Sequence, residues 1–484
     1  MASDYTAPCP PPAHAMTRYE SLALETEQRI RDGLLRAGER LPSVRKACHS
    51  LRLSPSTVLK AYYLLESRGL IEVRPQSGYY VKARLSRPLP EPEMTRPPAT
   101  STALEVSDFI FEILESVKDP AVVPLGSSFP SPFLYPLARL GRFLAAAARH
   151  MDPLATVTDL PPGNEELRRQ IALRYLAHGG ALSPDEIIVT SGAMEALNLC
   201  LQALTRPGDL VVVESPSFYA GLQAIERLGL RVVEIPTHPR DGISLPALAE
   251  ALQRHPVKAC LLMANFQNPL GSLMPEANRR ELVALLAHHQ VPLVEDDTYA
   301  ELYFGKEAPL TLKSLDRQGL VLHVSSFSKS LAPGYRIGWV AAGRYARAVQ
   351  RLKLATSLAT TVPVQIALAD FMRQGAFDTH LRRLRGMLEL QEADMAAAVE
   401  RHFPPGTRMT RPRGGYFTWV ELPSGTDALA LHRAALARGI SIAPGPIFSA
   451  KREYGHCIRL NFGHPWSDTL EQAMATLGRL AATP

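Results

Sequence analysis

The sequence predicts a multidomain protein in which a small N-terminal α+β domain precedes a large α/β domain. At 484 residues the chain is too long for one compact core. A stretch over residues 85–98 holds five prolines in fourteen positions, which favours an extended linker. After it, short apolar runs alternate with helical segments, as in βα units around a mostly parallel sheet. We therefore expect a disordered tail over 1–15, a small domain over 16–84, a linker over 85–106 and a large domain over 107–484.

The positive charge of the chain is concentrated in the small domain. Residues 17–84 hold 13 Lys and Arg against 7 Asp and Glu, whereas the rest of the chain holds 40 of each. The whole net charge of +6 therefore lies in one sixth of the sequence. This distribution is typical of a nucleic-acid-binding module attached to a neutral body. A hydrophobic content of 46% excludes a disordered or fibrous protein.

Cysteine usage and hydropathy predict a cytoplasmic protein without a membrane anchor. No run reaches the roughly 18 apolar residues that a membrane span needs, and the first residues lack the order of a signal peptide. The cysteines are odd in number, widely spaced and never in a C-x-x-C pair, which argues against a disulfide framework or a metal site. They are Cys9, Cys48, Cys200, Cys260 and Cys457.

The small domain has a recognisable order of elements. Apolar residues between Tyr19 and Leu35 fall near helical spacing, and Ser43 opens a short second helix. Ser54 stands where an N-cap belongs and Pro55 where a first helical residue is tolerated, so a third helix runs from there to Gly69. The stretches LIEV and GYYV then form a hairpin. Helix, helix, turn, helix and hairpin make a winged helix-turn-helix.

The run ERLPSVRKACHSLRLSPSTVLKAYYLLESRGLIEVRPQSGYYV resembles the DNA-binding domain of GntR-type bacterial regulators. The resemblance implies that the third helix enters the major groove of double-stranded DNA and that the wing touches the backbone or minor groove. Pro55 stands where relatives often carry a base-reading arginine. A helix with a lysine and several hydroxyls is usually only solvated, but the complete element order and the localised charge favour DNA binding. The residues that would face DNA are Arg45, Ser54, Ser56, Thr57, Lys60, Gln76, Ser77 and Gly78.

Five apolar runs of the large domain are expected to be strands of one sheet, and each ends in polar residues. Ligands of open α/β sheets bind beyond the carboxyl ends of the strands, so these endings are expected to form one pocket. The runs are EIIVTS (186–191), LVVVES (210–215), ACLLMA (259–264), VPLVEDD (291–297) and GLVLHVSS (319–326).

The polar endings supply the groups that pyridoxal phosphate needs. Small residues after the first run can bring backbone N–H groups to a phosphate, and a carboxylate after the fourth can pair with a protonated ring nitrogen. A lysine after the fifth run can react with the aldehyde if the pocket keeps its amine neutral. Each of these groups alone usually has a structural role, but five such groups in order on successive strand ends favour a cofactor site. They are the run from Ser191 to Met194, Phe218 or Tyr219, Asn268, the EDDTY segment with Tyr299, and Lys329 with Arg336.

Residues from about 107 to 480 resemble a fold type I aminotransferase, with large and small subdomains, of the branch that contains aromatic and α-aminoadipate transaminases. The resemblance implies that Lys329 forms the Schiff base with the cofactor and moves protons, and that Asp296 pairs with the pyridine nitrogen. Tyr299 and Asn268 would bind the ring oxygen, and Phe218 would stack on the ring. The phosphate would be surrounded by Gly192, Ala193, Met194, Ser326, Ser328 and Arg336, and the substrate α-carboxylate would be bound by Arg459, with Gly415 and Asn268 at the same end.

A GntR-type winged helix joined to an aminotransferase-like domain is the architecture of MocR-type regulators. That resemblance implies a homodimer that binds DNA, pyridoxal phosphate and an amino acid or amine. Three functions remain open: a transcriptional regulator that senses the cofactor or an amino compound, an active transaminase with an accessory DNA-binding domain, and a regulator whose large domain is only a dimerising scaffold.

Overall fold

A computed structural model describes residues 18–31, 34–35, 38–67, 70–74, 77–81, 89–115, 119, 121–177 and 179–482. The chain forms two compact units, Met1–Pro88 and Leu89–Pro484. The predicted N-terminal tail lies outside the described residues. Among the described residues, no helix combines the length and the apolar character that a membrane crossing requires.

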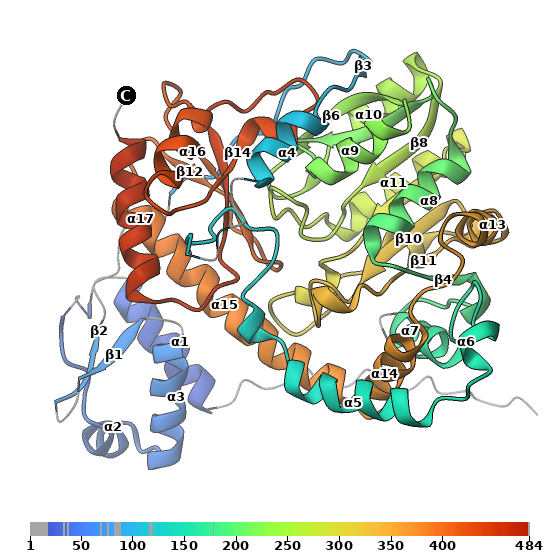
Figure 1. The fold of residues 1–484 in the computed structure, drawn as a ribbon. Coiled ribbons are helices and arrows are strands. Elements are labelled where there is room, and N and C mark those ends of the chain that lie inside the picture. Colours follow the sequence, from blue (N-terminus) through green and yellow to red (C-terminus); the bar gives the residue numbers. More distant parts are fainter. Residues whose placement is uncertain are drawn as a thin grey trace, which may run out of the picture. The chain divides into compact units, whose positions relative to one another are not determined.

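The first unit has the predicted order of helices and strands (Figure 1). Ser43 caps the second helix by accepting the Lys46 N–H, and Ser54 accepts the Thr57 N–H at the start of the third. Apolar residues of all three helices and both strands pack into one core, in which Ile30, Val58 and Ile71 are fully buried. The elements are α1 (Arg18–Arg31), α2 (Val44–Leu51), α3 (Pro55–Ser67), β1 (Ile71–Arg74) and β2 (Gly78–Val81).

The second unit is built on a nine-stranded sheet, and all five predicted strands are found in it. The strand order is β3-β6-β5-β8-β9-β10-β11-β4, with β7 paired to β6. The central strands from β6 to β10 are parallel, whereas β11 runs antiparallel to both of its neighbours. The strands are β3 (Thr102–Ala103), β4 (Ile187–Thr190), β5 (Leu210–Ser215), β6 (Arg231–His238), β7 (Gly242–Ile243), β8 (Val257–Leu262), β9 (Leu293–Asp296), β10 (Val321–Ser326) and β11 (Gly338–Ala341).

Helices cover both faces of this sheet (Figure 1), which explains why its central strands are apolar on both sides. Alternate residues of β5 point to opposite layers: Val211 and Val213 pack with α4, α8, α9 and α13, and Val212 packs with α10, α11 and α12. The helices are α4 (Ser107–Glu115), α8 (Ala193–Leu204), α9 (Tyr219–Arg227), α10 (Leu245–Arg254), α11 (Glu276–His289), α12 (Leu312–Leu315) and α13 (Ala346–Ser357).

Helices at the β4 and β11 edge and a smaller subdomain complete the second unit. Helices α5 (Leu137–His150), α7 (Glu165–Ala177) and α14 (Val362–Arg373) pack around the β4 and β11 edge, and α6 (Ala155–Thr158) precedes α7. The long helix α15 (Ala376–His402) leads into the small subdomain, whose sheet has the order β12-β13-β15-β14. Its remaining elements are β12 (Arg408–Met409), β13 (Phe417–Glu421), α16 (Ala428–Leu436), β14 (Ala443–Pro444), β15 (Cys457–Asn461) and α17 (Asp468–Ala481).

Much of the segment predicted as a linker belongs to the second unit. Residues from Leu89 onward fall in that unit, and the Thr95 hydroxyl donates to the Ser215 carbonyl at 2.6 Å. Thr102–Ala103 forms an edge strand antiparallel to β6. Proline cannot donate to a sheet, but the threonines between the prolines can make these hydrogen bonds, so residues 89–106 dock on the body of the unit.

Candidate functional site

A cavity of about 210 Å³ lies beyond the carboxyl ends of β4, β5, β9 and β10. The structure brings nine of the predicted cofactor residues to its wall: Ala193, Met194, Phe218, Asp296, Tyr299, Ser326, Ser328, Lys329 and Arg336. Parallel strands end at one edge of the sheet, so residues that are far apart in sequence converge there. The predicted residues Gly192, Asn268, Gly415 and Arg459 do not line this cavity but lie next to residues that do or behind them.

Lys329 lies in the turn after β10 with its amine directed into the cavity. Its Nζ donates a hydrogen bond of 2.8 Å to the Ser128 carbonyl and lies 3.7 Å from the centre of the Phe129 ring. The pKa of this amine is lowered to about 7, chiefly by burial and also by the positive charges of Arg459 and Arg336, although Asp296 acts in the opposite direction. A large share of the amine is therefore neutral near pH 7, as a nucleophile must be.

Covalent capture of an aldehyde by the cofactor-free protein is expected to reflect this low pKa. The neutral fraction of an amine with a pKa of about 7 rises about tenfold between pH 6 and pH 8 and then levels off. The rate of capture should follow that curve, measured by stopped-flow absorbance after mixing with pyridoxal phosphate. An ordinary lysine would keep gaining reactivity up to about pH 10, so a rate that still climbs steeply from pH 8 to pH 9.5 would contradict the expectation.

Asp296 is the last residue of β9, and its side chain is buried beside the cavity. The Thr298 N–H donates to its Oδ1 at 3.3 Å, and the Thr298 hydroxyl donates to the same oxygen. Burial raises the pKa of Asp296, while the bonds from Thr298 and the nearby Lys329 favour the ionised form. An ionised carboxylate in this position can pair with a protonated ring nitrogen.

Tyr299 and Asn268 are hydrogen-bonded to each other beside the cavity. The Asn268 amide donates to the Tyr299 hydroxyl at 3.3 Å, and both side chains are buried. Burial raises the pKa of Tyr299, so the phenol stays protonated and can donate to a ring oxygen.

The loop between β4 and α8, residues 191–192, can hold an anion, and we call it the anion loop. Gly192 caps α8 with a φ of +89°, and a Cβ at this position would lie 2.4 Å from Arg336 Nη2. Arg336 donates to the Ser191 carbonyl at 3.2 Å and to the Ser328 hydroxyl at 3.3 Å. The free N–H groups at the start of a helix and an adjacent guanidinium are suited to a phosphate.

A buried ion pair holds this loop from behind. Lys353 on α13 is 1% exposed, and its amine lies 3.0 and 3.1 Å from the two carboxylate oxygens of Glu195 in the first turn of α8. Glu195 also accepts the Ser191 N–H at 2.6 Å and the Ser357 hydroxyl. The pair therefore joins α13 to the start of the anion loop.

Breaking this pair is expected to destabilise both the fold and the loop. Replacing Lys353 by methionine should lower the free energy of unfolding by about 3 kcal/mol, because Glu195 is left without its buried counter-charge. Cofactor affinity should fall as well, because Glu195 orients Ser191. The matched control is Arg169→Met, which breaks the exposed pair with Glu166 and should change the free energy of unfolding far less. Urea unfolding and cofactor titration measure the two effects, and equal losses in both variants would contradict the expectation.

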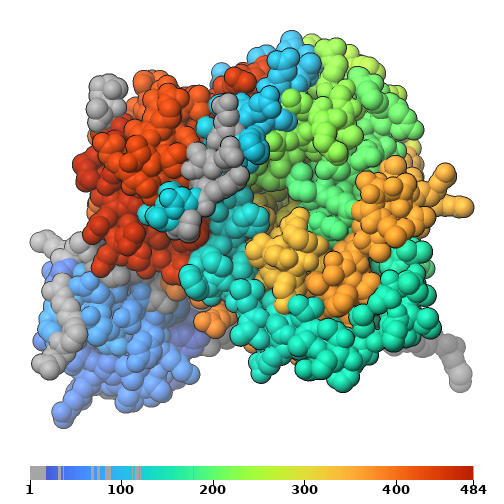
Figure 2. Space-filling model, in the orientation of Figure 1, coloured from blue at the N-terminus to red at the C-terminus, as the bar shows by residue number. Residues whose placement is uncertain are grey.

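Arg459 lies on β15 and is completely buried. Its Nη1 donates to the Asn268 side chain at 3.0 Å, and its Nη2 donates to the Gly126 and Ser127 carbonyls at 2.7 and 3.1 Å. Burial lowers its pKa. In Figure 2 the teal residues that precede α5 lie between the red small subdomain and the green and yellow parts of the large subdomain. The segment 126–129 thus contacts both Lys329 and Arg459.

Gly415 precedes β13 and has a φ of +70°. Its N–H donates to the Leu302 carbonyl at 2.9 Å, and a Cβ there would lie 3.3 Å from the Phe266 side chain. The next residue, Tyr416, donates its hydroxyl to the Ser128 carbonyl at 3.0 Å. Gly415 therefore supports the wall that holds the segment 126–129.

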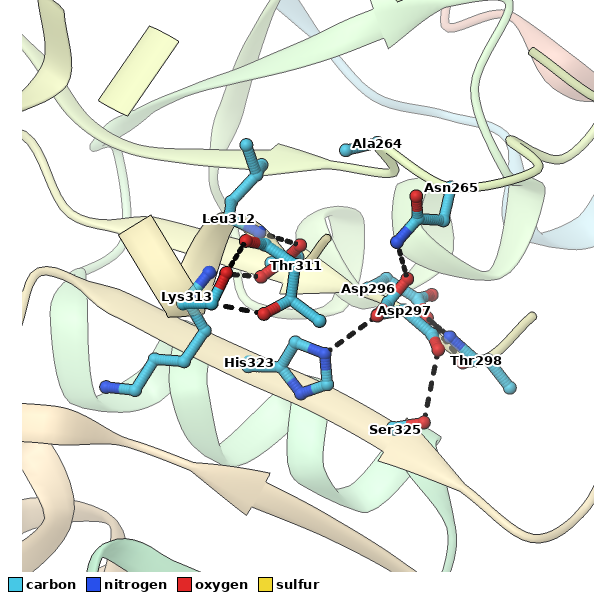
Figure 3. Close-up of polar contacts among 12 residues, drawn as sticks. Ala264, Asn265, Asp296, Asp297, Thr298, Thr311, Leu312, Lys313, His323 and Ser325 are labelled. Carbon is cyan, nitrogen blue, oxygen red and sulfur yellow. Dashed lines mark hydrogen bonds and ion pairs between the residues drawn. The ribbon is translucent and has the colours of Figure 1, made fainter. Parts of the chain in front are cut away.

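A second cluster of ionisable residues lies within β9, directly after it and within β10 (Figure 3). Glu295, Asp297 and His323 have their ligand atoms within 4.8 Å of one another. His323 contacts Asp297 at 2.9 Å and the Tyr175 hydroxyl at 2.6 Å. Glu295 accepts two backbone N–H groups at 2.6 and 2.9 Å, from Leu312 and Lys313. Because these oxygens are already hydrogen-bonded, the cluster fixes the end of β9 from which Asp296 projects.

In the first unit, the predicted DNA-facing residues surround the start of α3. Arg45, Ser54, Ser56 and Lys60 are exposed, and Thr57 is half-buried. The Ser54 hydroxyl lies 2.9 Å from that of Ser56 and 2.8 Å from that of Thr57. In the wing, Ser77 contacts the Tyr80 hydroxyl at 2.6 Å and Gly78 has a φ of +106°. Gln76 lies outside the described residues.

Comparison with known proteins matches both units to families. Residues 139–477 match the family model of aminotransferase class I and II, and residues 18–81 match that of bacterial regulatory proteins of the gntR family. The uncharacterized HTH-type transcriptional regulator YdcR of Escherichia coli (strain K12) is 46% identical over 465 residues, which cover 96% of this chain and 99% of YdcR. This chain belongs to the MocR-type transcriptional regulators.

Solved aminotransferases share the fold of the second unit of this MocR-type chain. The multiple substrate aminotransferase of Thermococcus profundus is 28% identical with a TM-score of 0.73, and the match covers 78% of this chain and 95% of that one. The α-aminoadipate aminotransferase LysN of Thermus thermophilus, solved with N-(5'-phosphopyridoxyl)-L-leucine, is 28% identical with a TM-score of 0.70 over 78% of this chain and 98% of its own. The predicted fold type I architecture is confirmed.

The cofactor of this MocR-type chain is pyridoxal 5'-phosphate, and the residues of the cavity fit it. The anion loop can bind the phosphate, Asp296 can pair with the ring nitrogen, and Lys329 can react with the aldehyde carbon. When bound, the cofactor supplies an electron-withdrawing ring that stabilises negative charge on an attached amino compound. The chain's own part is to hold the ring, to keep the Lys329 amine able to exchange protons and to exclude water.

Sequence reasoning did not assign several residues of the MocR-type pocket. Ser128 and Phe129 line the cavity but come from a loop about 200 residues before Lys329. Thr298 binds Asp296, and its place in the EDDTY segment was a usable signal. Glu195 and Lys353 lie behind the loop and carry no local signal, because only the fold brings α13 to α8.

Proposed function

We propose that this MocR-type regulator binds double-stranded operator DNA through its first unit and senses pyridoxal phosphate, an amino compound, or both, through its second. The observation that carries the proposal is that one chain holds an exposed, basic and hydroxyl-rich helix start together with nine of the predicted cofactor residues around one cavity. A regulator acts in the compartment that holds its DNA, and on that ground we propose a cytoplasmic location.

The proposed DNA contacts follow from charge and helix geometry. The start of α3 offers the hydroxyls of Ser54, Ser56 and Thr57, which suit phosphate oxygens. Arg45 and Lys60 add the salt-dependent attraction to the backbone. We assign Gln76, Ser77 and Gly78 to the wing contact on the resemblance to GntR-type domains.

The DNA proposal is tested with the full-length protein loaded with pyridoxal phosphate. Binding to a labelled fragment from upstream of its own gene is measured at several salt concentrations. Lys60→Ala should weaken binding and lower the slope of log affinity against log salt by about 1. The matched control is Lys258→Ala, an exposed lysine on β8 of the second unit. If the protein does not bind the DNA at moderate salt, or if Lys60→Ala and Lys258→Ala lose equal affinity for DNA, the result would count against the proposal.

We propose a homodimer on the basis of exposed apolar side chains in the second unit. Phe133 is 92% exposed, Leu154 and Val157 at α6 are 64% and 67% exposed, and Leu358 at the end of α13 is 56% exposed. Exposed apolar side chains that gather into one patch mark an interaction surface, and a second copy of the chain could cover such a patch. Light scattering of the purified protein should give twice the chain mass of 53.0 kDa, whereas a monomer at micromolar concentration would contradict the proposal.

A second candidate function is transamination, and the pairing of Arg459 with Asn268 favours it. A buried arginine at 3.0 Å from an amide beside the cavity is suited to bind an α-carboxylate in two hydrogen bonds. The names of the solved relatives describe aminotransferases with multiple substrates and with α-aminoadipate. Incubating the loaded protein with a panel of amino acids and recording its visible spectrum decides between the two functions. A lasting spectral conversion with release of a 2-oxo acid indicates turnover, and reversible binding alone indicates sensing.

A further inference from the structure

Glu214 is a buried carboxyl group for which the proposed function has no use. It is the residue before last in β5, and its side chain is 2% exposed. Its Oε2 accepts the Met263 N–H at 3.0 Å, but its Oε1 has no hydrogen-bond partner among the residues that the structure describes. A buried polar atom without a partner is unfavourable, so each such atom calls for an explanation.

The side chain of Glu214 borders a small cavity that also reaches Asp296. The cavity measures about 10 Å³, and its other walls include Leu197, Ser217 and Met263. A cavity of roughly 10–15 Å³ on this measure holds one water molecule, provided that the water finds two or more polar partners. The carboxyl groups of Glu214 and Asp296 supply two such partners, and the Ser217 hydroxyl is a third polar group on the wall. The site is therefore polar enough and large enough for a single water.

Burial and the nearby Asp296 favour the neutral form of Glu214. The pKa of Glu214 is raised to about 8, chiefly by burial and also by Asp296, while the Met263 N–H and the Gln267 side chain act in the opposite direction. Among the described residues that line the cavity, Asp296 is the other ionisable group. Because Oε2 accepts the Met263 N–H, the proton of the neutral acid belongs on Oε1, the atom that lacks a partner.

We propose that the cavity binds one water molecule and that Glu214 is a positioning residue, which donates a hydrogen bond through this water to the carboxylate of Asp296. This inference rests on the proposed role of Asp296 as the partner of the cofactor's ring nitrogen. The Thr298 N–H and hydroxyl bind Asp296 from one side, and the water binds it from the other. The carboxylate is then held ionised and fixed in direction.

Two substitutions of Glu214 separate hydrogen bonding from ionisation. Glu214→Gln keeps a neutral donor of the same size, so it should retain the cofactor with an affinity within about twofold of the unaltered protein. Above pH 8, native Glu214 ionises and places a second negative charge near Asp296, which the glutamine cannot do. Glu214→Met keeps the volume but removes the donor, and should weaken cofactor binding about tenfold.

The test uses the full chain loaded with pyridoxal phosphate and records the visible spectrum of the cofactor from pH 6 to pH 9.5. The unaltered protein should show a spectral step centred near pH 8, and Glu214→Gln should lack it. The matched control is Glu234→Gln. Glu234 lies in the middle of the neighbouring strand β6 and is also a buried carboxyl with an oxygen that has no partner among the described residues. It does not line either cavity, so its variant should keep the step. A crystal structure should show a water within hydrogen-bond distance of both carboxyl groups.

A dry cavity, or a step near pH 8 that survives in Glu214→Gln, would overturn the inference. Asp296→Ala keeps this failure apart from a failure of the proposed site. If Asp296→Ala changes the spectrum while the Glu214 variants do not, only the role of Glu214 is lost. If Asp296→Ala also leaves the spectrum unchanged, the assignment of Asp296 fails and the inference falls with it. If Glu214→Met does not fold, the comparison of Glu214→Gln with Glu234→Gln still shows whether Glu214 causes the spectral step.

Discussion

Replacing Lys329 by alanine is expected to abolish covalent attachment of pyridoxal phosphate and to reduce any transamination at least about 100-fold. Lys329 carries the amine that is directed into the cavity, and burial keeps its pKa at about 7. Removing it takes away both the nucleophile and the group that can move a proton, and one positioned acid or base commonly contributes about 100- to 10,000-fold to a rate. Reduction with borohydride followed by intact-mass analysis measures the covalent attachment.

The control is Lys353→Met, which removes a different buried lysine of the same unit but leaves the cavity amine in place. Lys353→Met should still bind the cofactor covalently when the cofactor is supplied in excess. Covalent attachment that persists in Lys329→Ala would refute the assignment of Lys329. The same variant also tests whether the second unit is only a scaffold: unchanged DNA binding and an unchanged response to amino compounds would favour a dimerising role without sensing.

Replacing Arg459 by alanine is expected to weaken the binding of α-amino acids about 100-fold or more. The guanidinium is the buried cation that can form two charged hydrogen bonds with a carboxylate, and each such bond contributes about 1.5 kcal/mol or more. Amines that lack the carboxylate should bind with similar affinity to the unaltered protein and to Arg459→Ala. Titrating the loaded protein with an amino acid and with its decarboxylated amine, monitored by absorbance, measures the difference.

Arg411→Ala serves as the control, since Arg411 is an exposed arginine of the same unit that pairs with Glu400 at 3.3 Å. It should leave both titrations unchanged. Because Arg459 also binds the Gly126 and Ser127 carbonyls, thermal unfolding of the variant must be compared first. Equal losses for the amino acid and for the amine would show that Arg459 supports the loop and does not bind the carboxylate.

Most of the residues around the cavity could be predicted because each follows a strand directly. Asp296 ends β9, Lys329 follows β10, and the anion loop follows β4, so hydrophobic runs with polar endings were sufficient to find them. The order of helices and strands in the first unit could also be predicted, because caps such as Ser43 and Ser54 act locally.

Other residues could not be found in this way. Ser128 reaches Lys329 across 201 positions of sequence, and the docking of residues 89–106 on the second unit was not expected from their proline content. The edge pairing of Thr102–Ala103 with β6 depends on a strand more than 120 residues later. None of these contacts has a local signal, because the partners meet only after the sheet has formed.

What the sequence determines and what only the fold determines differ for a physical reason. Periodicity, caps and the order of residues at strand ends act over a few residues, and they established the two domains, the cofactor class and the residues that carry its chemistry. Ionisation and orientation depend on what the fold packs against those residues. Burial lowers the pKa of Lys329, the Glu195–Lys353 pair holds the anion loop, and the cavity beside Glu214 exists because β5, α8 and β9 meet there. Only the tertiary structure could decide these, because desolvation is a property of the packed chain and not of any segment of it.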